Sequence, residues 1–311
     1  MKILLIGGGG FVGFHLCEAL RIKKHEVFAA DLPGVCAGSP DMFPVDLTDS
    51  SSVENLLKQI VPDRIFLLAA VSSVALSWKN PQLTVNVNIL GSLNVLNAMA
   101  KIVPQARLIY IGSGEEYGVL EAEDRPFTED SPCCPCNPYA VTKFAAGKIL
   151  ELMSVKQGLD FVHLRPLNHF GPGQKEGFVV ADFSAQIVRA EIGKCDPVMK
   201  VGNLASKRDF LFVDDVIEAY CLIAEAEKCP HATYNISTGR IYSIQSVLDY
   251  LVSLAKVKIR IEIDAAKFRP VESRALIASN QLICNDFGWH PKTSLEKGLD
   301  KTLNWWRSKL G

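Results

Sequence analysis

Short apolar runs alternate with amphipathic stretches through the first half of the chain. The apolar runs are KILLI, EVFAA, RIFLLAA and RLIYIGS, and the stretches between them include FVGFHLCEALRIKK, VENLLKQI and LTVNVNILGSLNVLNAMAKI. Buried strands that alternate with helices of about ten residues or more are typical of βαβ units on a parallel sheet. We therefore predict an α/β fold built on a Rossmann-type, doubly wound parallel sheet.

The regular alternation of apolar runs and helical stretches ends after FVHLRPLNHFGPGQ, where the connections become longer and richer in glycine and proline. Helical stretches still follow, among them VVADFSAQIVRAEI, VDDVIEAYCLIAEAEK and LEKGLDKTLNWWRSKL. This pattern predicts a smaller C-terminal α/β lobe that binds substrate beside the sheet. We assign residues 1–166 with about 207–236 to the Rossmann domain, and 167–206 with 237–311 to the lobe. The cleft between the two is the expected site.

Composition and charge narrow the classes of partner. Lys and Arg total 33 against 34 for Asp and Glu, so no net field attracts nucleic acid or an anionic membrane. No segment reaches the roughly 20 apolar residues of a membrane span, and the opening apolar run is too short for a signal peptide. The nine cysteines contain no CxxC pair, and Cys133, Cys134 and Cys136 lack further ligands at metal-site spacing. We expect a cytoplasmic protein with reduced thiols and without a metal site, a nucleic-acid partner or a membrane partner.

A glycine-rich turn follows the first strand and leads directly into a helix. Gly7, Gly10 and Gly13 allow a tight turn, and with Phe11 and Val12 they bring backbone amides and the positive end of the helix toward a pyrophosphate. Glycines in this pattern are weak evidence alone, but their position between strand and helix strengthens the interpretation. The pattern predicts that the first domain binds a dinucleotide.

Two acidic residues point to the adenosine end of that dinucleotide. Asp31 ends the second strand, 18 residues beyond Gly13, where a carboxylate can accept hydrogen bonds from both ribose hydroxyls and repel a 2′-phosphate. No arginine follows it in LPGVC, so NAD(H) is favoured, although NADP(H) stays possible. Asp46 lies after the third strand, where it either meets the adenine or belongs to the start of the next helix.

The candidate catalytic pair is Tyr139 and Lys143, four residues apart in the helical stretch NPYAVTKFAAGKIL. Their side chains therefore lie one turn apart on a single face. A free tyrosine with a pKa of about 10 is a poor acid or base near neutrality, and a neighbouring ammonium and an oxidised nicotinamide both favour the phenolate. Ser113, at the end of RLIYIGS, adds a hydroxyl at the carboxyl edge of the sheet.

The combination of GGGGFVG, LAAVSS, GSGEEYG and YAVTK resembles the extended short-chain dehydrogenase/reductase family, the NAD-dependent epimerases and dehydratases that modify nucleotide sugars. Within it, NHFGPGQKEGFVVADFSAQI, VGNLASKRDF and RPVESRALIASN resemble the GDP-4-keto-6-deoxy-mannose reductases. The resemblance covers nearly the whole chain. It implies reduction of GDP-4-keto-6-deoxy-D-mannose to GDP-D-rhamnose, with hydride transfer to carbon 4 of the sugar.

The resemblance also implies roles for particular residues. Ser113 would hydrogen-bond the sugar carbonyl, Tyr139 would protonate its oxygen, and Lys143 would hold the nicotinamide ribose while lowering the pKa of Tyr139. The cofactor would further be lined by Leu47, Leu68, Ala69, Ala70 and Leu167. The substrate would be held by Ser73, Asn168, Val180, Val201, Asn203, Arg208, Arg269 and Glu272. The two arginines can each donate forked hydrogen bonds to phosphate oxygens, or they can pair with Asp209 and Glu272 at the surface.

The sequence departs from the family pattern in three ways. Ile6 stands where threonine is common, and Ser273-Arg274 replaces Val-Pro, which affects the expected contacts to the base. Glu115 occupies the position of the glutamate that sugar-nucleotide dehydratases use to move protons, so it is also a candidate catalytic residue. Gly114 stands where dTDP-glucose dehydratases have an acid, which favours a reductase.

Other functions remain open at this point. A 4,6-dehydratase and a 4-epimerase would both keep Ser113, Tyr139 and Lys143, and a sensor that binds NAD(H) without chemistry would keep the fold. The resemblance and the apolar content of VNVNILGSLNVLNAMA predict a homodimer. In it, the helices beginning near Pro81 and Asn137 would pack across a two-fold axis.

Overall fold

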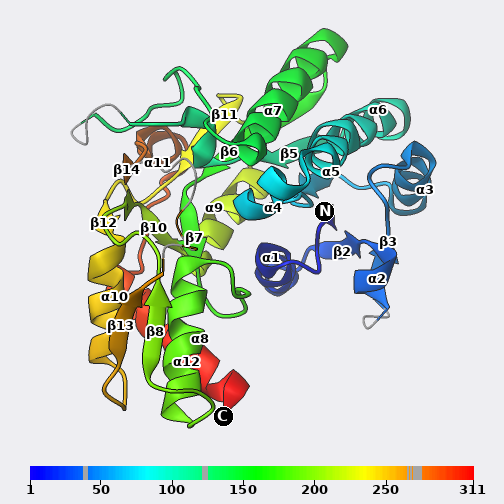
Figure 1. Cartoon of the computed structure of the whole chain (residues 1–311). Helices are drawn as coiled ribbons and strands as arrows, with labels where there is room; N and C mark the ends of the chain where they lie inside the picture. The colour runs from blue at the N-terminus through cyan, green and yellow to red at the C-terminus, as the bar shows by residue number, and fades with distance from the viewer. Residues whose placement is uncertain (38–40, 121–124, 265, 267, 269–274) are drawn as a thin grey trace.

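The computed structural model describes residues 1–311 except 38–40, 121–124, 265, 267 and 269–274. Its centre is a seven-stranded sheet with the order β11-β6-β5-β4-β1-β2-β3 (Figure 1). Every neighbouring pair of strands in this sheet is parallel, which confirms the predicted doubly wound fold. The strands are β1 (Lys2–Ile6), β2 (Glu26–Asp31), β3 (Met42–Pro44), β4 (Arg64–Leu67), β5 (Arg107–Ile111), β6 (Asp160–Pro166) and β11 (Thr233–Ile236).

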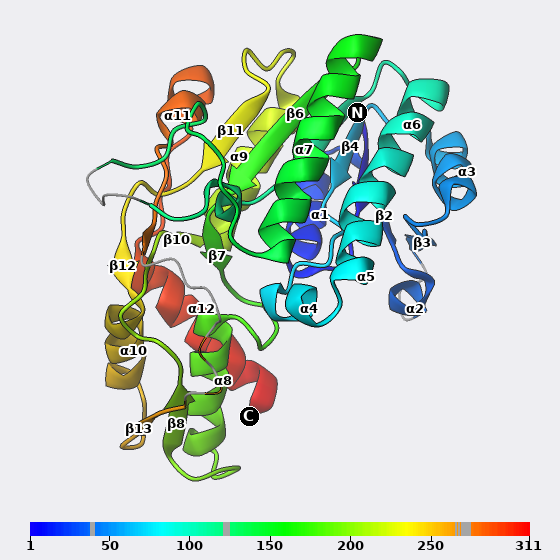
Figure 2. The same cartoon turned by 45° about the horizontal axis from the view of Figure 1, so that its top comes forward.

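Helices cover both faces of the sheet because both faces of each strand are apolar. Leu5 belongs to a core shared with α1 (Phe11–Ile22) and α9 (Val213–Glu225). Its neighbour Leu4 belongs to a second core on the opposite face, with α3 (Ser50–Ile60), α6 (Ser92–Ile102) and α7 (Pro138–Gln157) (Figure 2). Asp49 caps helix α3, because its side chain accepts a hydrogen bond from the Ser51 amide. The carboxyl edge of the sheet, where a cofactor would bind, therefore lies between two helical layers.

The long helix expected over 83–102 is interrupted. The structure has α5 (Pro81–Val85), then a π-helical segment η1 (Asn86–Gly91), then α6. The bulge turns the buried Asn88 amide inward, where its Oδ1 accepts from Val71 N (2.8 Å) and its Nδ2 donates to Thr142 Oγ1 (3.0 Å). Single π-turns often mark functional sites. This one ties the loop after β4 to α7.

Several of the remaining elements gather below the sheet in the view of Figure 1, where they form the predicted smaller lobe. In the lobe, α8 (Val179–Glu191) packs against α12 (Leu295–Leu310) and α10 (Ile244–Ser253), and β8 (Val198–Val201) pairs with β13 (Arg260–Ile263). The assignment of residues to two domains stays a prediction. The other elements are α2 (Pro33–Cys36), α4 (Val74–Lys79), η2 (Gly114–Tyr117), β7 (Asn168–Phe170), β9 (Lys207–Arg208), β10 (Phe210–Phe212), β12 (Tyr242–Ser243), β14 (Ala275–Leu276) and α11 (Gln281–Phe287).

Among the described residues, one helical stretch, Pro81–Ile102, is long and apolar enough to cross a membrane by length and composition. Its most apolar window is 44% buried inside the protein. Core helices often pass the same test, so this stretch is weak evidence for a membrane span.

Candidate active site

A cleft of about 660 Å³ opens at the carboxyl ends of the central strands. Its walls come from the glycine-rich turn, the loops after β2, β3 and β4, the η2 turn, and the start of α7. This is the edge at which ligands bind in open α/β sheets. The predicted residues that line it are Gly7, Gly10, Phe11, Val12, Gly13, Asp31, Asp46, Leu47, Leu68, Ala69, Ala70, Ser113, Glu115, Tyr139, Lys143, Leu167 and Asn168.

The glycine-rich turn has the geometry of a pyrophosphate cradle. Gly7 has a φ of +96°, and a Cβ there would lie 2.5 Å from Ala69 N. A Cβ on Gly13 would lie 2.3 Å from Gly7 O, so the turn can close onto α1 only with glycine at both positions. Gly10 caps α1 without a side-chain hydrogen bond. The first amides of α1 therefore suit the phosphate oxygens of a dinucleotide.

The adenosine end of the cleft carries two carboxylates. Asp31 Oδ2 accepts from Gly9 N (3.1 Å) and Oδ1 from Leu32 N (2.8 Å), so this side chain already braces the glycine-rich turn. Asp46 Oδ1 accepts from Thr48 N at 2.8 Å, the turn-forming role that was the alternative to an adenine contact. Among the lining residues that the structure describes, this end has no lysine or arginine.

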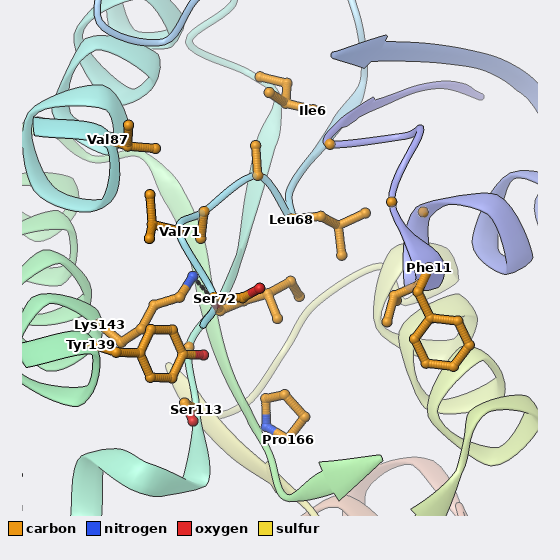
Figure 3. A pocket seen from close by; sticks show the side chains of 18 of the residues that line it. Ile6, Phe11, Leu68, Val71, Ser72, Val87, Ser113, Tyr139, Lys143 and Pro166 are labelled. Carbon is orange, nitrogen blue, oxygen red and sulfur yellow. Dashed lines mark hydrogen bonds between the residues drawn. The ribbon is translucent and has the colours of Figure 1, made fainter. Parts of the chain in front are cut away.

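Tyr139, Lys143 and Ser113 meet on one side of the cleft, facing Phe11 across it (Figure 3). Helix α7 begins at Asn137, whose Oδ1 accepts from Ala140 N, and this cap places Tyr139 in the first turn. Lys143 Nζ donates to Ile111 O at 2.7 Å and lies 5.0 Å from the centre of the Tyr110 ring. The catalytic constellation expected from the sequence is therefore assembled from α7 and the end of β5.

Burial dominates the acid–base properties of this pair. It lowers the pKa of Lys143 to about 8, although the negative charge of Glu116 opposes this. Burial also raises the pKa of Tyr139 well above its ordinary value, and a hydrogen bond with Ser113 lowers it only in part. We expected the Lys143 ammonium to lower the pKa of Tyr139, but in the structure this ammonium is directed at Ile111 O and burial outweighs the other influences. Tyr139 is therefore a neutral phenol, ready to donate a proton.

Glu115 is the one acid beside this pair among the described lining residues. Its Oε2 accepts from Asn137 Nδ2 at 3.0 Å, which links it to the cap of α7. At Gly114 a Cβ would lie 2.6 Å from Leu167 Cδ1, so a larger residue would need Leu167 to move. Beside Tyr139 and Lys143 the cleft therefore has one carboxylate among its described lining residues.

Three polar side chains in the cleft wall each have a buried atom that makes no hydrogen bond to the described residues. Tyr220 Oη, Asn168 Oδ1 and Gln174 Oε1 are buried and have no hydrogen-bond partner among the described residues. Buried polar groups are normally paired, so these atoms indicate a polar ligand. The sequence analysis missed Tyr220 and Gln174, because an isolated polar residue in a helix or a loop gives no periodic signal.

Most of the other residues expected to hold the substrate lie away from the described lining of the cleft. Ser73 caps α4, its Oγ accepting from Leu76 N at 3.2 Å, and its neighbour Ser72 lines the cleft instead. Val180 and Val201 are buried in the core of the lobe. Asn203 donates to Ser206 Oγ, and Arg208 donates to Lys207 O; neither is among the described lining residues. Arg269, Glu272, Ser273 and Arg274 lie outside the described residues.

Cys133, Cys134 and Cys136, which the structure describes, are not arranged as metal ligands. Cys134 and Cys136 are exposed, and Cys136 Sγ donates to Cys134 O at 3.2 Å. Within the described part of the chain, no group of three or more His, Cys, Asp or Glu side chains could hold a metal ion. All nine cysteines are free thiols.

The chain is similar to enzymes of nucleotide-sugar metabolism. It matches the family model of GDP-mannose 4,6 dehydratase over residues 4–302. A GDP-6-deoxy-D-mannose reductase of Pseudomonas aeruginosa is 32% identical over 310 residues, or 99% of this chain and 98% of the relative. A GDP-mannose 4,6 dehydratase of Arabidopsis thaliana is 32% identical over 260 residues, or 81% of this chain and 70% of the relative.

Solved structures agree with these relatives. The structure of RMD from Pseudomonas aeruginosa complexed with NADPH has a TM-score of 0.86 at 30% identity, covering 99% of both chains. The Thermus thermophilus UDP-glucose 4-epimerase complex with NAD has a TM-score of 0.89 at 27% identity, covering 100% of both chains. The similarity thus includes a reductase, a dehydratase and an epimerase, with either nicotinamide cofactor.

Proposed function

We propose that this chain, which belongs to the GDP-mannose 4,6 dehydratase family of NAD(P)-dependent enzymes, reduces the 4-keto group of a GDP-4-keto-6-deoxyhexose. With GDP-4-keto-6-deoxy-D-mannose as substrate, the product is GDP-D-rhamnose. The observation that carries the proposal is the position of Tyr139, which is hydrogen-bonded to Ser113 one helical turn from Lys143 in a cleft that has a dinucleotide cradle.

Each of these side chains has a defined task in the reduction. NAD(P)H, when bound, supplies the hydride for carbon 4. Ser113 donates a hydrogen bond to the sugar carbonyl, and Tyr139 gives its proton to the oxygen on which negative charge develops. Lys143 holds the nicotinamide ribose and compensates the negative charge of the phenolate that proton transfer leaves. The raised pKa of Tyr139 suits this direction, because the acid must still hold its proton at neutral pH.

Gly114 favours reduction over dehydration of the dTDP-glucose type, which uses an acid at that position. A 4,6-dehydratase removes a proton from carbon 5 and protonates the hydroxyl that leaves carbon 6, and these two transfers can be made by one carboxylate in turn or shared by two acids. Here Glu115 is the one described carboxylate at the sugar end, and Gly114 packs against Leu167. Glu115 nevertheless makes the dehydratase the second candidate, and the likeness to a UDP-glucose 4-epimerase keeps the epimerase third.

The proposed reaction is tested with the purified protein, GDP-4-keto-6-deoxy-D-mannose and NADH. The proposal predicts loss of the NADH absorbance band in step with appearance of a 6-deoxyhexose nucleotide. Loss of water from GDP-mannose without NADH consumption would instead identify the dehydratase. If UDP-glucose is converted to its 4-epimer, the protein is an epimerase.

The lobe is the proposed binding place for the nucleotide part of the substrate. We assign the GDP moiety to the lobe side of the cleft. Asn168 lines the cleft there, and Arg208, Arg269 and Glu272 are further predicted contacts. The unpartnered Asn168 Oδ1 supports this assignment. The identity of the base stays a prediction, because residues 269–274, which are expected to select it, lie outside the described part of the structure.

Asp31 makes NAD(H) the proposed cofactor, and its charge is testable. Asp31→Asn keeps an oxygen for the Gly9 amide while it removes the charge that repels a 2′-phosphate. We expect the preference for NADH over NADPH, measured as the ratio of kcat/KM values, to fall by about tenfold or more, which equals about 1.4 kcal/mol. Asp46→Asn, at the same end of the cleft, is the matched control. An unchanged ratio in Asp31→Asn would mean that another group selects the cofactor.

We also propose a homodimer formed by the helices beside the catalytic pair. Exposed apolar side chains gather on α4, the 81–102 stretch and α7, including Leu76, Leu83, Leu90, Val141 and Leu152. Light scattering at micromolar concentration is expected to give twice the chain mass of 34.1 kDa. Leu90→Asp should give monomers, whereas Ile22→Asp, an exposed apolar residue on α1, should not. A monomeric wild type would refute the dimer.

The cytoplasm is the proposed location, since all nine cysteines are free thiols and such thiols persist in a reducing compartment. The non-enzymatic sensor is the remaining alternative. It predicts NADH binding without turnover of any sugar nucleotide.

A further inference from the structure

A buried ionic cluster lies directly behind the catalytic serine. Glu116, in the η2 turn, is 0% exposed, and its carboxylate has three partners. Oε1 accepts from Ser113 N at 2.8 Å and pairs with His163 Nε2 at 3.0 Å, while Oε2 accepts from Arg165 Nε at 2.9 Å. The sequence analysis did not identify this cluster.

The cluster fills the space between β5, β6 and α7. A Cβ on Gly112 would lie 2.1 Å from His163 Nε2 and 2.3 Å from Glu116 Oε1. A Cβ on Gly147 of α7 would lie 2.5 Å from His163 Cε1. The His163 ring also lies 5.2 Å from the Tyr110 ring, and Tyr110 Oη donates to Lys143 O at 3.2 Å. The cluster therefore contacts the supports of both Ser113 and Lys143.

The charge of the cluster acts on the same two catalytic side chains. Burial opposes ionisation of Glu116, but His163, Arg165 and the Ser113 amide lower its pKa, so it stays a carboxylate. Its negative charge raises the pKa of both Lys143 and Tyr139. The titratable groups that pack around the pair are Glu115 and Glu116 from η2, Tyr110 from β5, His163 and Arg165 from β6, and Tyr220 from α9.

A stabilising role alone explains this arrangement poorly. Replacing buried ion pairs with apolar residues of similar volume is often neutral or favourable for stability. Reduction, by contrast, needs Lys143 as an ammonium and Tyr139 as a phenol at the same pH, and a fixed negative charge favours the protonated form of each.

We propose that Glu116 is a positioning residue of the active site: anchored by His163 and Arg165, it holds the Ser113 backbone in place beside Tyr139 and supplies the negative charge that keeps Lys143 an ammonium. This inference rests on the proposed reduction, in which both side chains act in their protonated forms. Glu116 acts through Ser113, Tyr139 and Lys143, and it does not touch the substrate.

The charge is tested with Glu116→Gln, which keeps the shape and an oxygen for the Ser113 amide. Lys143 loses its proton as the pH rises through about 8, so wild-type kcat/KM for the sugar nucleotide should decline above that pH. Without the neighbouring carboxylate, the decline should begin at least about half a pH unit lower, a roughly threefold change in the ionisation constant. A purely structural role would lower kcat/KM equally at every pH, and an unshifted profile would overturn the proposal.

The anchoring is tested with Glu116→Asp, which keeps the charge but is one methylene too short to reach all three partners. Here kcat should fall several-fold while the alkaline limb stays at its wild-type pH. Wild-type kcat in this variant would refute the anchoring even if Glu116→Gln does not fold. Glu191→Gln is the matched control, since Glu191 is a nearly buried carboxylate paired with Arg307 in the lobe, away from the cleft. It should keep the wild-type profile.

A second readout separates this inference from the proposed reaction. The affinity for NADH, followed by quenching of protein fluorescence, should show the same alkaline shift in Glu116→Gln, because Lys143 holds the nicotinamide ribose. This measurement needs no sugar turnover. An inactive wild type refutes the reductase, whereas an unshifted NADH-binding profile in Glu116→Gln refutes the role of Glu116.

Discussion

Replacing Tyr139 with phenylalanine is expected to lower kcat for the sugar nucleotide by about 10²–10⁴-fold, the usual contribution of a positioned general acid. The ring still fills its place beside Ser113, but no proton is available for the oxygen of the sugar. The fold should be intact, because the hydroxyl is not needed to start α7, which Asn137 caps. The measurement is initial-rate kinetics with NADH, together with NADH affinity, which should stay near the wild-type value.

Tyr250→Phe is the matched control for Tyr139→Phe. Its hydroxyl donates to Asp300 Oδ1 in the lobe, so its loss should leave kcat unchanged. Turnover by Tyr139→Phe within about threefold of wild type would remove the phenol from the mechanism. If NADH still bound and no variant changed any turnover, the sensor would be the better account.

Replacing Arg107 with methionine is expected to cause the largest loss of stability. This side chain at the start of β5 is buried, and its guanidinium donates to Asp160 Oδ2 (2.8 Å), Ile223 O (3.0 Å), Ala226 O (2.8 Å) and Glu227 O (2.9 Å). It thereby joins the sheet to the end of α9. Methionine would leave buried carbonyls unpaired, at a cost of about 3–5 kcal/mol.

Thermal unfolding measures this effect. For a chain of 311 residues a loss of 3–5 kcal/mol lowers the Tm by roughly 5–8 °C. Arg260→Met is the control, because Arg260 forms an exposed pair with Glu262 and should change stability by at most about 0.5 kcal/mol. Equal Tm values for the two variants would show that the Arg107 contacts add nothing to stability.

The fold could be predicted because its signals are local and repeated. Apolar runs and helical periodicity identify the sheet and its covering helices, and Gly7, Gly13 and Asp31 have spacings that only a strand–turn–helix satisfies. Tyr139 and Lys143 could be paired because helical spacing alone brings them together. These parts of the site follow from contacts that are short in sequence.

The remaining parts depend on contacts that are distant in sequence. The π-turn at Asn88 depends on hydrogen bonds from the Asn88 side chain to Val71 and Thr142. The local pattern of apolar and polar residues does not predict it. The pKa of Tyr139 depends on burial by the assembled cleft. For the Glu116 cluster there was one usable signal. His163 and Arg165 are two apart in a strand that is otherwise apolar after Asp160, and buried basic side chains require an acid.

Deuterium transfer tests the central claim most directly. The protein is incubated with GDP-4-keto-6-deoxy-D-mannose and NADH that carries deuterium at the transferable position of the nicotinamide, and the sugar is analysed by mass spectrometry and NMR. Our account predicts one deuterium at carbon 4 of the product for each NADH oxidised. A product without deuterium at carbon 4, or deuterium-free loss of water from GDP-mannose in the same preparation, would contradict it.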